Sequence, residues 1–321
     1  MEHKFIVSSS PHIKSKESVS SVMLDVIIAL LPACVMGVYY FGIRALIVML
    51  TAIASSILSE YIFQKIAKKR VTTGDLSAVV TGLLLGMNMP STIPLWMVAI
   101  GSAFAIIIVK QLYGGLGKNF MNPALAARCF MLAAWAGSMS AFVSPFAGVD
   151  AVSTATPLAV LKGVQTGELP SLLSAFLGNR GGCIGETSGV ALLVGFLYLV
   201  IKRVVDVKIP VAYLGTFAVL MYLFGTNTTG GSQAYFTAMH ILSGGLLIGS
   251  FFMATDYVTS PTSPKGRWIF GIGCGLLTFA LRRFGSYPEG VSYAIILMNV
   301  ATPLIERFTI VKPFGEVRKN G

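Results

Sequence analysis

Long apolar runs, separated by short polar or basic segments, fill most of this chain. Many of these runs approach the roughly 20 residues that a helix needs to cross about 30 Å of hydrocarbon. The pattern therefore predicts an all-α integral membrane protein with about ten transmembrane helices. The expected spans lie near residues 22–42, 43–63, 76–89, 94–112, 124–143, 187–201, 209–225, 236–254, 268–283 and 290–308.

The third run is shorter than the others and ends at Met89-Pro90. A segment of this kind predicts a half-span, whose irregular backbone is buried in protein rather than exposed to lipid.

The composition supports a membrane protein. Hydrophobic residues make up 55% of the chain and charged residues 12%, and the mean hydropathy is +0.77. A soluble domain carries roughly 25% charged residues. This excess of apolar side chains is more than one compact core hides, so it excludes an ordinary soluble enzyme, a disordered chain and a fibrous repeat.

The formal net charge of +11 does not favour nucleic acid, because the basic residues stand in short clusters between apolar runs. Such spacing is typical of cytoplasmic loops under the positive-inside rule. The apolar runs between these loops are expected to contact membrane lipid. With the N-terminus inside, 19 of the 24 Lys and Arg residues fall on or near the cytoplasmic side, which predicts that both termini are cytoplasmic. The exceptions are Arg44, Lys162, Arg180, Arg282 and Arg283.

The spans divide the chain into two halves around one long loop. Five spans on each side must run in opposite directions, which predicts two inverted five-helix repeats, as in many ion-coupled membrane proteins. Both halves contain a basic residue, an aromatic-glycine turn and then a Met-Asn step, at Asn122 and at Asn299. The predicted parts are a cytoplasmic arm (1–21), the first repeat (22–143), an extracytoplasmic loop (144–186), the second repeat (187–308) and a cytoplasmic tail (309–321).

The four cysteines are far apart and form no CxxC pair. They are interpreted as small buried hydrophobes rather than ligands of an iron–sulfur cluster or of zinc. Any cofactor must therefore be held in another way. The cysteines are Cys34, Cys129, Cys183 and Cys274.

The long loop contains two candidate binding segments. In the segment 150–162, Thr156 is the expected N-cap of a short helix with Pro157 at its first position, and free N–H groups there favour a phosphate. In the segment 178–188, glycines allow close backbone approach to a flat or phosphorylated ligand, and Arg180 offers a forked donor. The simpler interpretations are a plain helix start and a flexible surface turn.

Two further segments combine polar groups with membrane depth. In 119–130, Asn122-Pro123 begins a helix, and Arg128 either faces a cavity or reaches out to the membrane surface. In 253–267, Asp256 stands among hydroxyl groups that either coordinate a cation or cap and turn the chain. No metal ligand is assigned.

Together these segments give the chain its resemblance to a known family. It resembles the RnfD protein of the Rnf complex and, more distantly, the NqrB protein of the sodium-pumping NADH:quinone oxidoreductase. The similarity runs from Ser10-Pro11-His12 to the final span. Its most specific stretches are Asn119–Arg128, Gly181–Ser188, Phe252–Arg267 and Arg282–Pro303.

The resemblance implies a covalent flavin. In this family FMN is attached through its phosphate to a threonine in a Ser-Gly-Ala-Thr-like motif, and the matching stretch here is Ser153-Thr154-Ala155-Thr156. Thr156 is therefore the expected FMN acceptor, whereas Thr154 replaces the usual glycine and adds a second hydroxyl. In relatives, the corresponding membrane subunit can also hold a second flavin, a non-covalent riboflavin. The expected neighbours of the FMN are Asp150, Ser153, Thr154, Arg180, Gly181, Gly182, Glu186 and Thr187.

The resemblance also implies a function and partners. The expected function is electron transfer within an NADH–ferredoxin oxidoreductase that moves Na⁺ or H⁺ across a bacterial cytoplasmic (inner) membrane. The expected partners are the other proteins of the Rnf complex, RnfA, RnfB, RnfC, RnfE and RnfG, and a flavin transferase. The chain has no nucleotide-binding glycine motif and no cluster cysteines, so no complete turnover and no catalytic residue are assigned to it alone. The alternative is a stand-alone secondary transporter without a redox cofactor.

Overall fold

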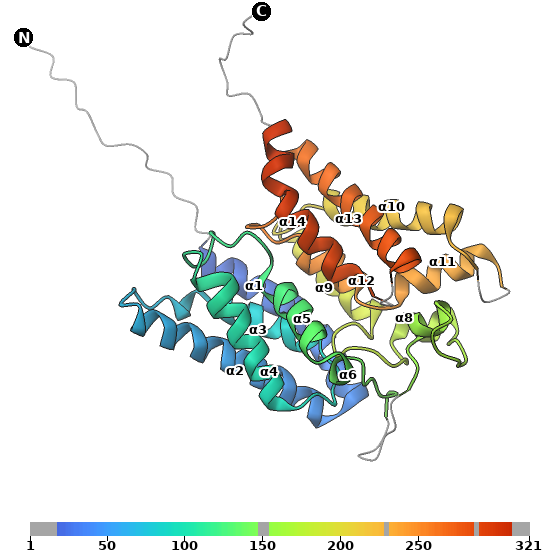
Figure 1. The fold of residues 1–321 in the computed structure, drawn as a ribbon, viewed down its shortest axis with the longest axis horizontal. Helices are drawn as coiled ribbons and strands as arrows, with labels where there is room; N and C mark the ends of the chain where they lie inside the picture. Colours follow the sequence, from blue (N-terminus) through green and yellow to red (C-terminus); the bar gives the residue numbers. More distant parts are fainter. Residues whose placement is uncertain (1–17, 147–153, 228–230, 286–288, 310–321) are drawn as a thin grey trace, which may run out of the picture.

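The computed structural model describes residues 18–146, 154–227, 231–285 and 289–309. These residues form helices joined by loops, and no strand occurs among them. Figure 1 shows two groups of helices side by side, one from the first half of the chain and one from the second half. The fold class is therefore all-α, as the hydrophobic pattern predicts.

The first group contains two long helices and several shorter ones. The helix α4 continues directly into η2, whose backbone is π-helical, and α5 ends where the short α6 begins. The elements are α1 (Val19–Phe41), α2 (Ile43–Ile66), η1 (Thr73–Asp75), α3 (Ser77–Met87), α4 (Leu95–Ala103), η2 (Phe104–Gln111), α5 (Pro123–Ala134) and α6 (Ala136–Met139).

Two short helices, α7 (Pro157–Leu161) and α8 (Leu172–Leu177), interrupt the long loop before the second group begins. The second group ends with its two longest helices, α13 and α14. Its elements are α9 (Gly189–Ile201), α10 (Lys208–Phe224), α11 (Gln233–Leu242), α12 (Leu246–Ile248), η3 (Gly249–Met253), α13 (Pro264–Phe284) and α14 (Val291–Phe308).

Each of the ten apolar runs coincides with one helical element or with two or three in succession. Within the described ranges, three helices are long and apolar enough to cross a membrane on their own: α1, α2 and α14. A fourth span results if α11 and the following α12–η3 segment, which are bent by 65°, count as one. The remaining apolar helices have 10 to 17 residues, so length and composition support several membrane helices.

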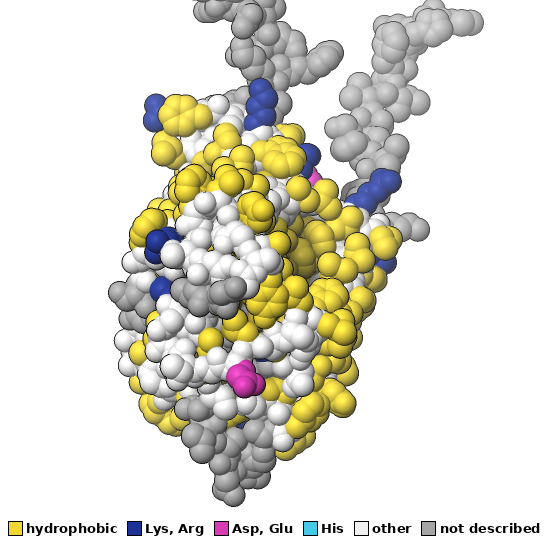
Figure 2. Space-filling model, turned by 90° about the vertical axis from the view of Figure 1, so that its right-hand side faces the viewer, with side chains coloured by type: hydrophobic (Ala, Val, Ile, Leu, Met, Phe, Trp, Pro, Cys, Tyr) yellow, Lys and Arg dark blue, Asp and Glu magenta, His cyan; other side chains and the backbone are white. Residues whose placement is uncertain are grey.

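Many large hydrophobic side chains remain on the surface, as is expected of helices that face lipid. Large hydrophobic side chains of α1, α2 and α10 remain exposed, among them Val35 at 64% and Ile43 at 66%. Figure 2 shows hydrophobic side chains spread over the visible face, with most of the visible Lys and Arg in its upper part. This distribution fits a belt of lipid-facing side chains with the charges at its edges.

The end of α3 confirms the prediction of an irregular backbone buried in protein. Beyond Met87 the chain leaves the helix, and the long loop supplies partners for its free carbonyl groups. The N–H of Ile184 donates to the carbonyl of Met89 at 3.0 Å, and the N–H of Gly185 donates to that of Met87 at 2.7 Å. These bonds fix the 178–188 segment against the first group of helices.

Two helix pairs connect the groups. The first helix of one group, α1, packs against the first of the other, α9, and α5 packs against α14. The α1–α9 contact is close because Gly195 carries no side chain where it meets the backbone of Ala29. This pairing brings the loops before α9 and α14 over the end of α5.

Candidate functional site

A cavity of about 310 Å³ lies where the long loop covers the end of α5. We call it the threonine cavity, because the side chain of Thr156 lines it. Six of the residues predicted near a flavin meet around it: Thr154, Thr156, Arg180, Gly181, Gly182 and Glu186. Its other lining residues include Arg128, Leu132, Met139, Phe142, Leu158, Glu289 and Tyr293.

Thr156 is the N-cap of α7, as the sequence predicts. Its hydroxyl accepts a hydrogen bond from the N–H of Ala159 at 3.3 Å, and Pro157 takes the first helical position. Thr154 is held separately, because its N–H donates to the carbonyl of Phe142 at 2.8 Å. The hydroxyls of Thr154 and Ser144 lie 3.2 Å apart. Both predicted hydroxyls thus line the same cavity from different places on the loop.

The interpretation of 178–188 as a flexible surface turn is wrong, because the segment is folded inwards. Arg180 is 6% exposed and Glu186 is 5% exposed. The Nη2 group of Arg180 donates to the carbonyl of Glu186 at 2.6 Å, and the N–H of Cys183 donates to Oε1 of Glu186 at 2.7 Å. Thr187 is buried but does not line the cavity.

Arg128 does not extend to the membrane surface. It is 2% exposed, and its guanidinium forms an ion pair with Glu289, whose carboxylate also accepts from the N–H of Gly245 at 2.8 Å. Nη1 of Arg128 donates to Oδ1 of Asn88 at 2.6 Å, just beyond the end of α3. The interpretation of Arg128 as facing a cavity is the one that the structure supports.

Burial changes the proton affinities of two loop groups at this cavity. It lowers the pKa of Arg180 to about 10, although the nearby Glu186 opposes this change. Burial raises the pKa of Glu289, and the charge of Arg128 acts in the opposite direction. Both shifts reflect the cost of holding a charge away from water.

Several buried polar atoms at the cavity have no hydrogen-bond partner among the described residues. They are Nε of Arg128, Nη1 of Arg180 and Oε2 of Glu186. Buried polar groups are normally paired, so these three atoms stand out in the cavity wall as buried groups whose bonding capacity is unused.

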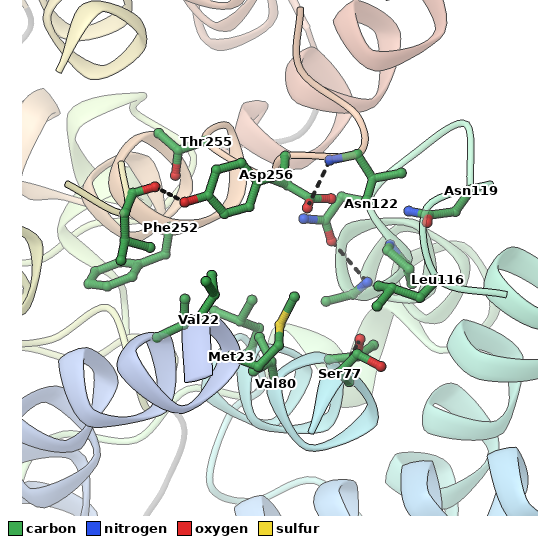
Figure 3. Close-up of a pocket in the computed structure, with 18 of the residues that line it drawn as sticks. Val22, Met23, Ser77, Val80, Leu116, Asn119, Asn122, Phe252, Thr255 and Asp256 are labelled. Carbon is green, nitrogen blue, oxygen red and sulfur yellow. Dashed lines mark hydrogen bonds between the residues drawn. The ribbon is translucent and has the colours of Figure 1, made fainter. Parts of the chain in front are cut away.

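A second, smaller cavity of about 90 Å³ lies between the two groups of helices. We call it the asparagine cavity, because Asn119 and Asn122 line it. Figure 3 shows Asp256 and Thr255 on the side opposite Met23 and Val80. Asn122 caps α5 by accepting from the N–H groups of residues 124 and 125, and its amide donates to the carbonyl of Met253 at 3.3 Å.

Asp256 behaves as a turn residue, which favours the simpler interpretation of its segment. Its carboxylate accepts from the N–H of Val258 at 3.4 Å and from the hydroxyl of Thr259 at 3.1 Å. Within the ranges that the structure describes, no three His, Cys, Asp or Glu residues group in a way that could hold a metal ion.

A buried ion pair beside the asparagine cavity was not predicted. Nζ of Lys110 lies 2.9 Å from Oε1 of Glu60, and the two side chains are 2% and 0% exposed. Lys110 comes from the π-helical η2 and also donates to the hydroxyl of Ser77 at 2.6 Å. Opposite charges at Glu60 and Lys110 in two different spans are a weak signal, because the sequence does not show which charged residues meet.

The remaining predicted residues, Asp150 and Ser153, lie outside the described residues. Conversely, Glu289 and Tyr293 line the threonine cavity and were not singled out. Both fall in the stretch Arg282–Pro303, one of the most specific parts of the family resemblance. The specificity of that stretch is the sequence signal from which Glu289 and Tyr293 could have been chosen.

Comparisons with known proteins agree with the resemblance. A family model described as NQR2, RnfD, RnfE matches residues 6–315. The D component of the Na(+)-translocating ferredoxin:NAD(+) oxidoreductase complex of Acetobacterium woodii is 51% identical over 316 residues, which cover 98% of this chain and 96% of the relative.

More distant relatives carry similar names. The D component of the proton-translocating ferredoxin:NAD(+) oxidoreductase complex of Clostridium ljungdahlii is 46% identical, covering 98% of this chain and 97% of the relative. The D component of the ion-translocating oxidoreductase complex of Stutzerimonas stutzeri is 37% identical, covering 94% and 93%. With a match along nearly its whole length, this chain belongs to the NQR2, RnfD, RnfE family.

Proposed function

We propose that this chain is the flavin-carrying membrane subunit of a redox-driven ion pump of the Rnf type. It transfers electrons through an FMN attached to Thr156, in a complex that couples ferredoxin–NAD redox chemistry to Na⁺ or H⁺ movement. The names of the relatives support this assignment, and they do not favour a stand-alone transporter. The observation that carries the flavin is the threonine cavity, which Thr156 lines together with Arg128 and Arg180.

The residues at the threonine cavity fit an FMN phosphate. A phosphodiester on Thr156 carries one negative charge, and Arg180 and Arg128 line the same cavity. Arginine pairs well with phosphate because its fork of donors matches the phosphate oxygens. The helix α7 has only five residues, so the arginines rather than a helix dipole supply the attraction.

The cavity also fits the flavin ring in size and lining. Its volume of about 310 Å³ lies at the lower end of the roughly 300–1,000 Å³ that is usual for ligand pockets. Leu132, Met139 and Phe142 supply apolar wall, and Gly181 and Gly182 leave the backbone open to close approach. FMN would supply electron transfer in one- or two-electron steps, while these residues hold it and exclude water.

The second expected flavin, riboflavin, is proposed to bind at the asparagine cavity. Asn119, Asn122 and Asp256 line this cavity, and their amides and carboxylate would exchange their present bonds to the chain for bonds to the edge of a flavin ring. The cavity of about 90 Å³ is smaller than the ligand, so its lining must move apart on binding. Flavin extraction from the purified chain tests this: riboflavin should be released without proteolysis and should decrease in Asn122→Leu.

The proposed architecture has ten spans in two inverted repeats in a bacterial cytoplasmic membrane, with both termini inside. Two features support the repeat: the third span of each half is broken, at the end of α3 and between α11 and α12, and α1–α9 and α5–α14 pair across the halves. A reporter inserted within 160–170 should be active only outside the cytoplasm, and one at residue 205 only inside. Activity of both reporters on the same side would contradict this topology.

The partners proposed for the chain are RnfA, RnfB, RnfC, RnfE and RnfG, together with a flavin transferase that modifies Thr156. Co-purification of the tagged chain from its own membranes, followed by mass spectrometry, identifies these proteins. The partners must carry out the NADH and ferredoxin steps, because this sequence has neither a nucleotide-binding glycine motif nor paired cysteines.

The decisive experiment is the mass of the peptide that contains residues 150–162. The chain is produced together with its transferase, digested, and searched for this peptide with and without the mass of FMN. Thr156→Val should abolish the modified peptide and the yellow colour, whereas the matched variant Thr154→Val should keep both. An unmodified peptide from the parent chain, made with the transferase present, would overturn the flavin assignment and leave the transporter alternative.

A further inference from the structure

A third cavity, of about 430 Å³, lies at the end of α9. We call it the arginine cavity, because Arg203 and Arg267 line it. Its walls come from the end of α9, the α9–α10 loop, the segment after η3 and the start of α13. It shares Tyr257 with the asparagine cavity, but neither arginine lines that cavity. The arginine cavity is therefore a separate, positively charged space.

The positive charge of this cavity is only partly balanced. The carboxylate of Asp206 accepts from Nη1 of Arg267 at 2.7 Å and from Nζ of Lys208 at 3.0 Å, so one anion is shared by two cations. Arg203 is exposed, and its guanidinium forms no hydrogen bond or ion pair with another residue that the structure describes. Three cations against one carboxylate suit an anion with several acceptor oxygens, such as a phosphate.

An apolar stripe of α10 leads away from the arginine cavity. Its exposed positions follow one another at intervals of three or four residues, so they share one face of the helix. They are Val207, which also lines the cavity, Val211, Gly215, Val219 and Tyr222. A Cβ on Gly215 would meet nothing within 4 Å, so the middle of the stripe is open. Figure 1 shows α10 at the edge of the second group of helices.

The length of this stripe matches one leaflet of a bilayer. At 1.5 Å per residue, the positions 207–222 extend over roughly 22 Å. Half of a hydrocarbon core of about 30 Å is shorter than this, so the stripe can follow a whole acyl chain. Trp268, exposed beside Arg267 at the start of α13, is of the type that gathers at the membrane–water interface. The cavity thus lies where headgroups are expected and the stripe where acyl chains are expected.

We propose that the arginine cavity binds the headgroup of an anionic phospholipid. Arg203 donates to the phosphate, Arg267 adds positive charge, and an acyl chain lies along the stripe 207–222. A free phosphate or an acidic peptide would use the cavity alone, whereas a phospholipid uses the cavity and the stripe together. Basic pockets at the cytoplasmic side of membrane helices bind lipids of this kind. The cytoplasmic side rests on the proposed topology, but the binding of lipid rests neither on the topology nor on a flavin.

Native mass spectrometry of the full chain in detergent, with phosphatidylglycerol added, tests the site. The parent should bind phosphatidylglycerol more tightly than the zwitterionic phosphatidylcholine. Arg203→Gly removes the guanidinium and should keep the fold, because the φ of Arg203 is 58° and glycine adopts this conformation freely. We expect its affinity for phosphatidylglycerol to be about tenfold lower, as for the loss of one hydrogen bond to a charged group.

Lys68→Gly is the matched control. Lys68 is also exposed, lies two residues beyond the end of α2 as Arg203 lies two residues beyond the end of α9, and has a φ of 52°. This variant therefore loses a cation from an equivalent backbone position outside the arginine cavity, and it should keep the parent affinity. Arg203→Gln replaces Arg203→Gly if the glycine variant does not fold, and it should show the same loss. An unchanged affinity in a folded Arg203 variant, or an equal loss in Lys68→Gly, overturns the site.

Two further measurements separate a lipid from the other occupants. Glycerol 3-phosphate has an anionic phosphate but no acyl chain, so it should displace phosphatidylglycerol poorly. If it binds as tightly as the lipid, the ligand is a free phosphate compound and the lipid is overturned. A photoreactive amino acid in place of Val207 should couple to phospholipid when native membranes are illuminated. Coupling to a protein instead would show that a partner chain covers this surface, and would also overturn the lipid site.

Discussion

Asn122 and Asn299, from opposite halves of the chain, meet in the centre of the molecule. With its amide oriented so that both groups are satisfied, Asn299 accepts from the N–H of Asn122 at 3.1 Å and donates to the carbonyl of Thr259 at 3.3 Å. The residues are 4% and 1% exposed, so neither carboxamide faces lipid. This contact confirms the prediction, made from the cost of an unpaired amide in hydrocarbon, that both side chains line a shared central region.

Removing the Asn299 amide should weaken the contact between α5 and α14. Asn299→Leu leaves the N–H of Asn122 without its acceptor and the carbonyl of Thr259 with only the hydroxyl of Thr302, so we expect a loss of about 1–3 kcal/mol of stability. Unfolding in detergent, followed by circular dichroism, measures it. Val300→Leu is the control, because Val300 is exposed on the same helix and should change little. Equal stability of the two variants would contradict the role of Asn299.

Local features of the fold could be predicted from the sequence. Asn122 and Thr156 are N-caps because each combines a short polar side chain with a following proline, and this signal lies within a few residues. The apolar runs predicted the positions of the helices because hydrophobicity is likewise a local property of the sequence. Their grouping depends on contacts between distant segments, so only the equal number of spans and the shared Met-Asn step related the two halves.

The interior of the candidate site could not be predicted in this way. Arg128 pairs with Glu289, 161 positions further along the chain, and neither residue has a local pattern that names its partner. The segment 178–188 looks like a surface turn because it is rich in glycine, yet its N–H groups are used by the broken end of α3. Burial of such loops follows from the tertiary fold and not from composition.

The buried pair Glu60–Lys110 should be sensitive to the loss of either partner. Glu60→Gln leaves the Lys110 ammonium without its counter-ion at 2% exposure, and Lys110→Met leaves the carboxylate with only the neutral amides of Gln64 and Gln111. Breaking a buried ion pair costs about 3–5 kcal/mol, so we expect both variants to be much less stable in thermal unfolding.

The exposed pair Lys202–Asp25 is the control for that comparison. Its atoms are 3.9 Å apart and the Lys202 side chain is 52% exposed. Lys202→Met should therefore change stability by about 1 kcal/mol or less. Equal losses of stability in Lys110→Met and Lys202→Met would contradict the prediction that burial makes the Glu60–Lys110 pair more sensitive to the loss of a partner.

Asp206 should make the stability of the α9–α10 loop depend on acid. Burial alone would raise its pKa, but hydrogen bonds from Lys208 and Arg267 outweigh burial and lower it. The folded pKa is thus below the unfolded value of about 3.9, so the stabilisation is present above about pH 4 and disappears as the pH falls through the folded pKa.

Asp206→Asn tests this pH dependence. At neutral pH the variant should lose about 1 kcal/mol or less, since the pair with Arg267 is partly exposed. At a pH below the folded pKa the parent and the variant should unfold at the same temperature. A difference that stays constant across the acid range would contradict the assignment, and the measurement is a series of melting curves in detergent.

The close contact between α1 and α9 gives the sharpest packing prediction. A Cβ on Gly195 would overlap the carbonyl oxygen of Ala29, which is backbone and has no flexible end to move aside. Gly195→Ala must therefore separate the two helices, and overpacking of this kind typically costs about 1–3 kcal/mol. Gly215→Ala in α10 is the matched control, because a Cβ there meets nothing within 4 Å and alanine favours a helix by about 1 kcal/mol. Opposite shifts of the unfolding temperature are expected, and a Gly195→Ala variant as stable as Gly215→Ala would contradict the α1–α9 packing.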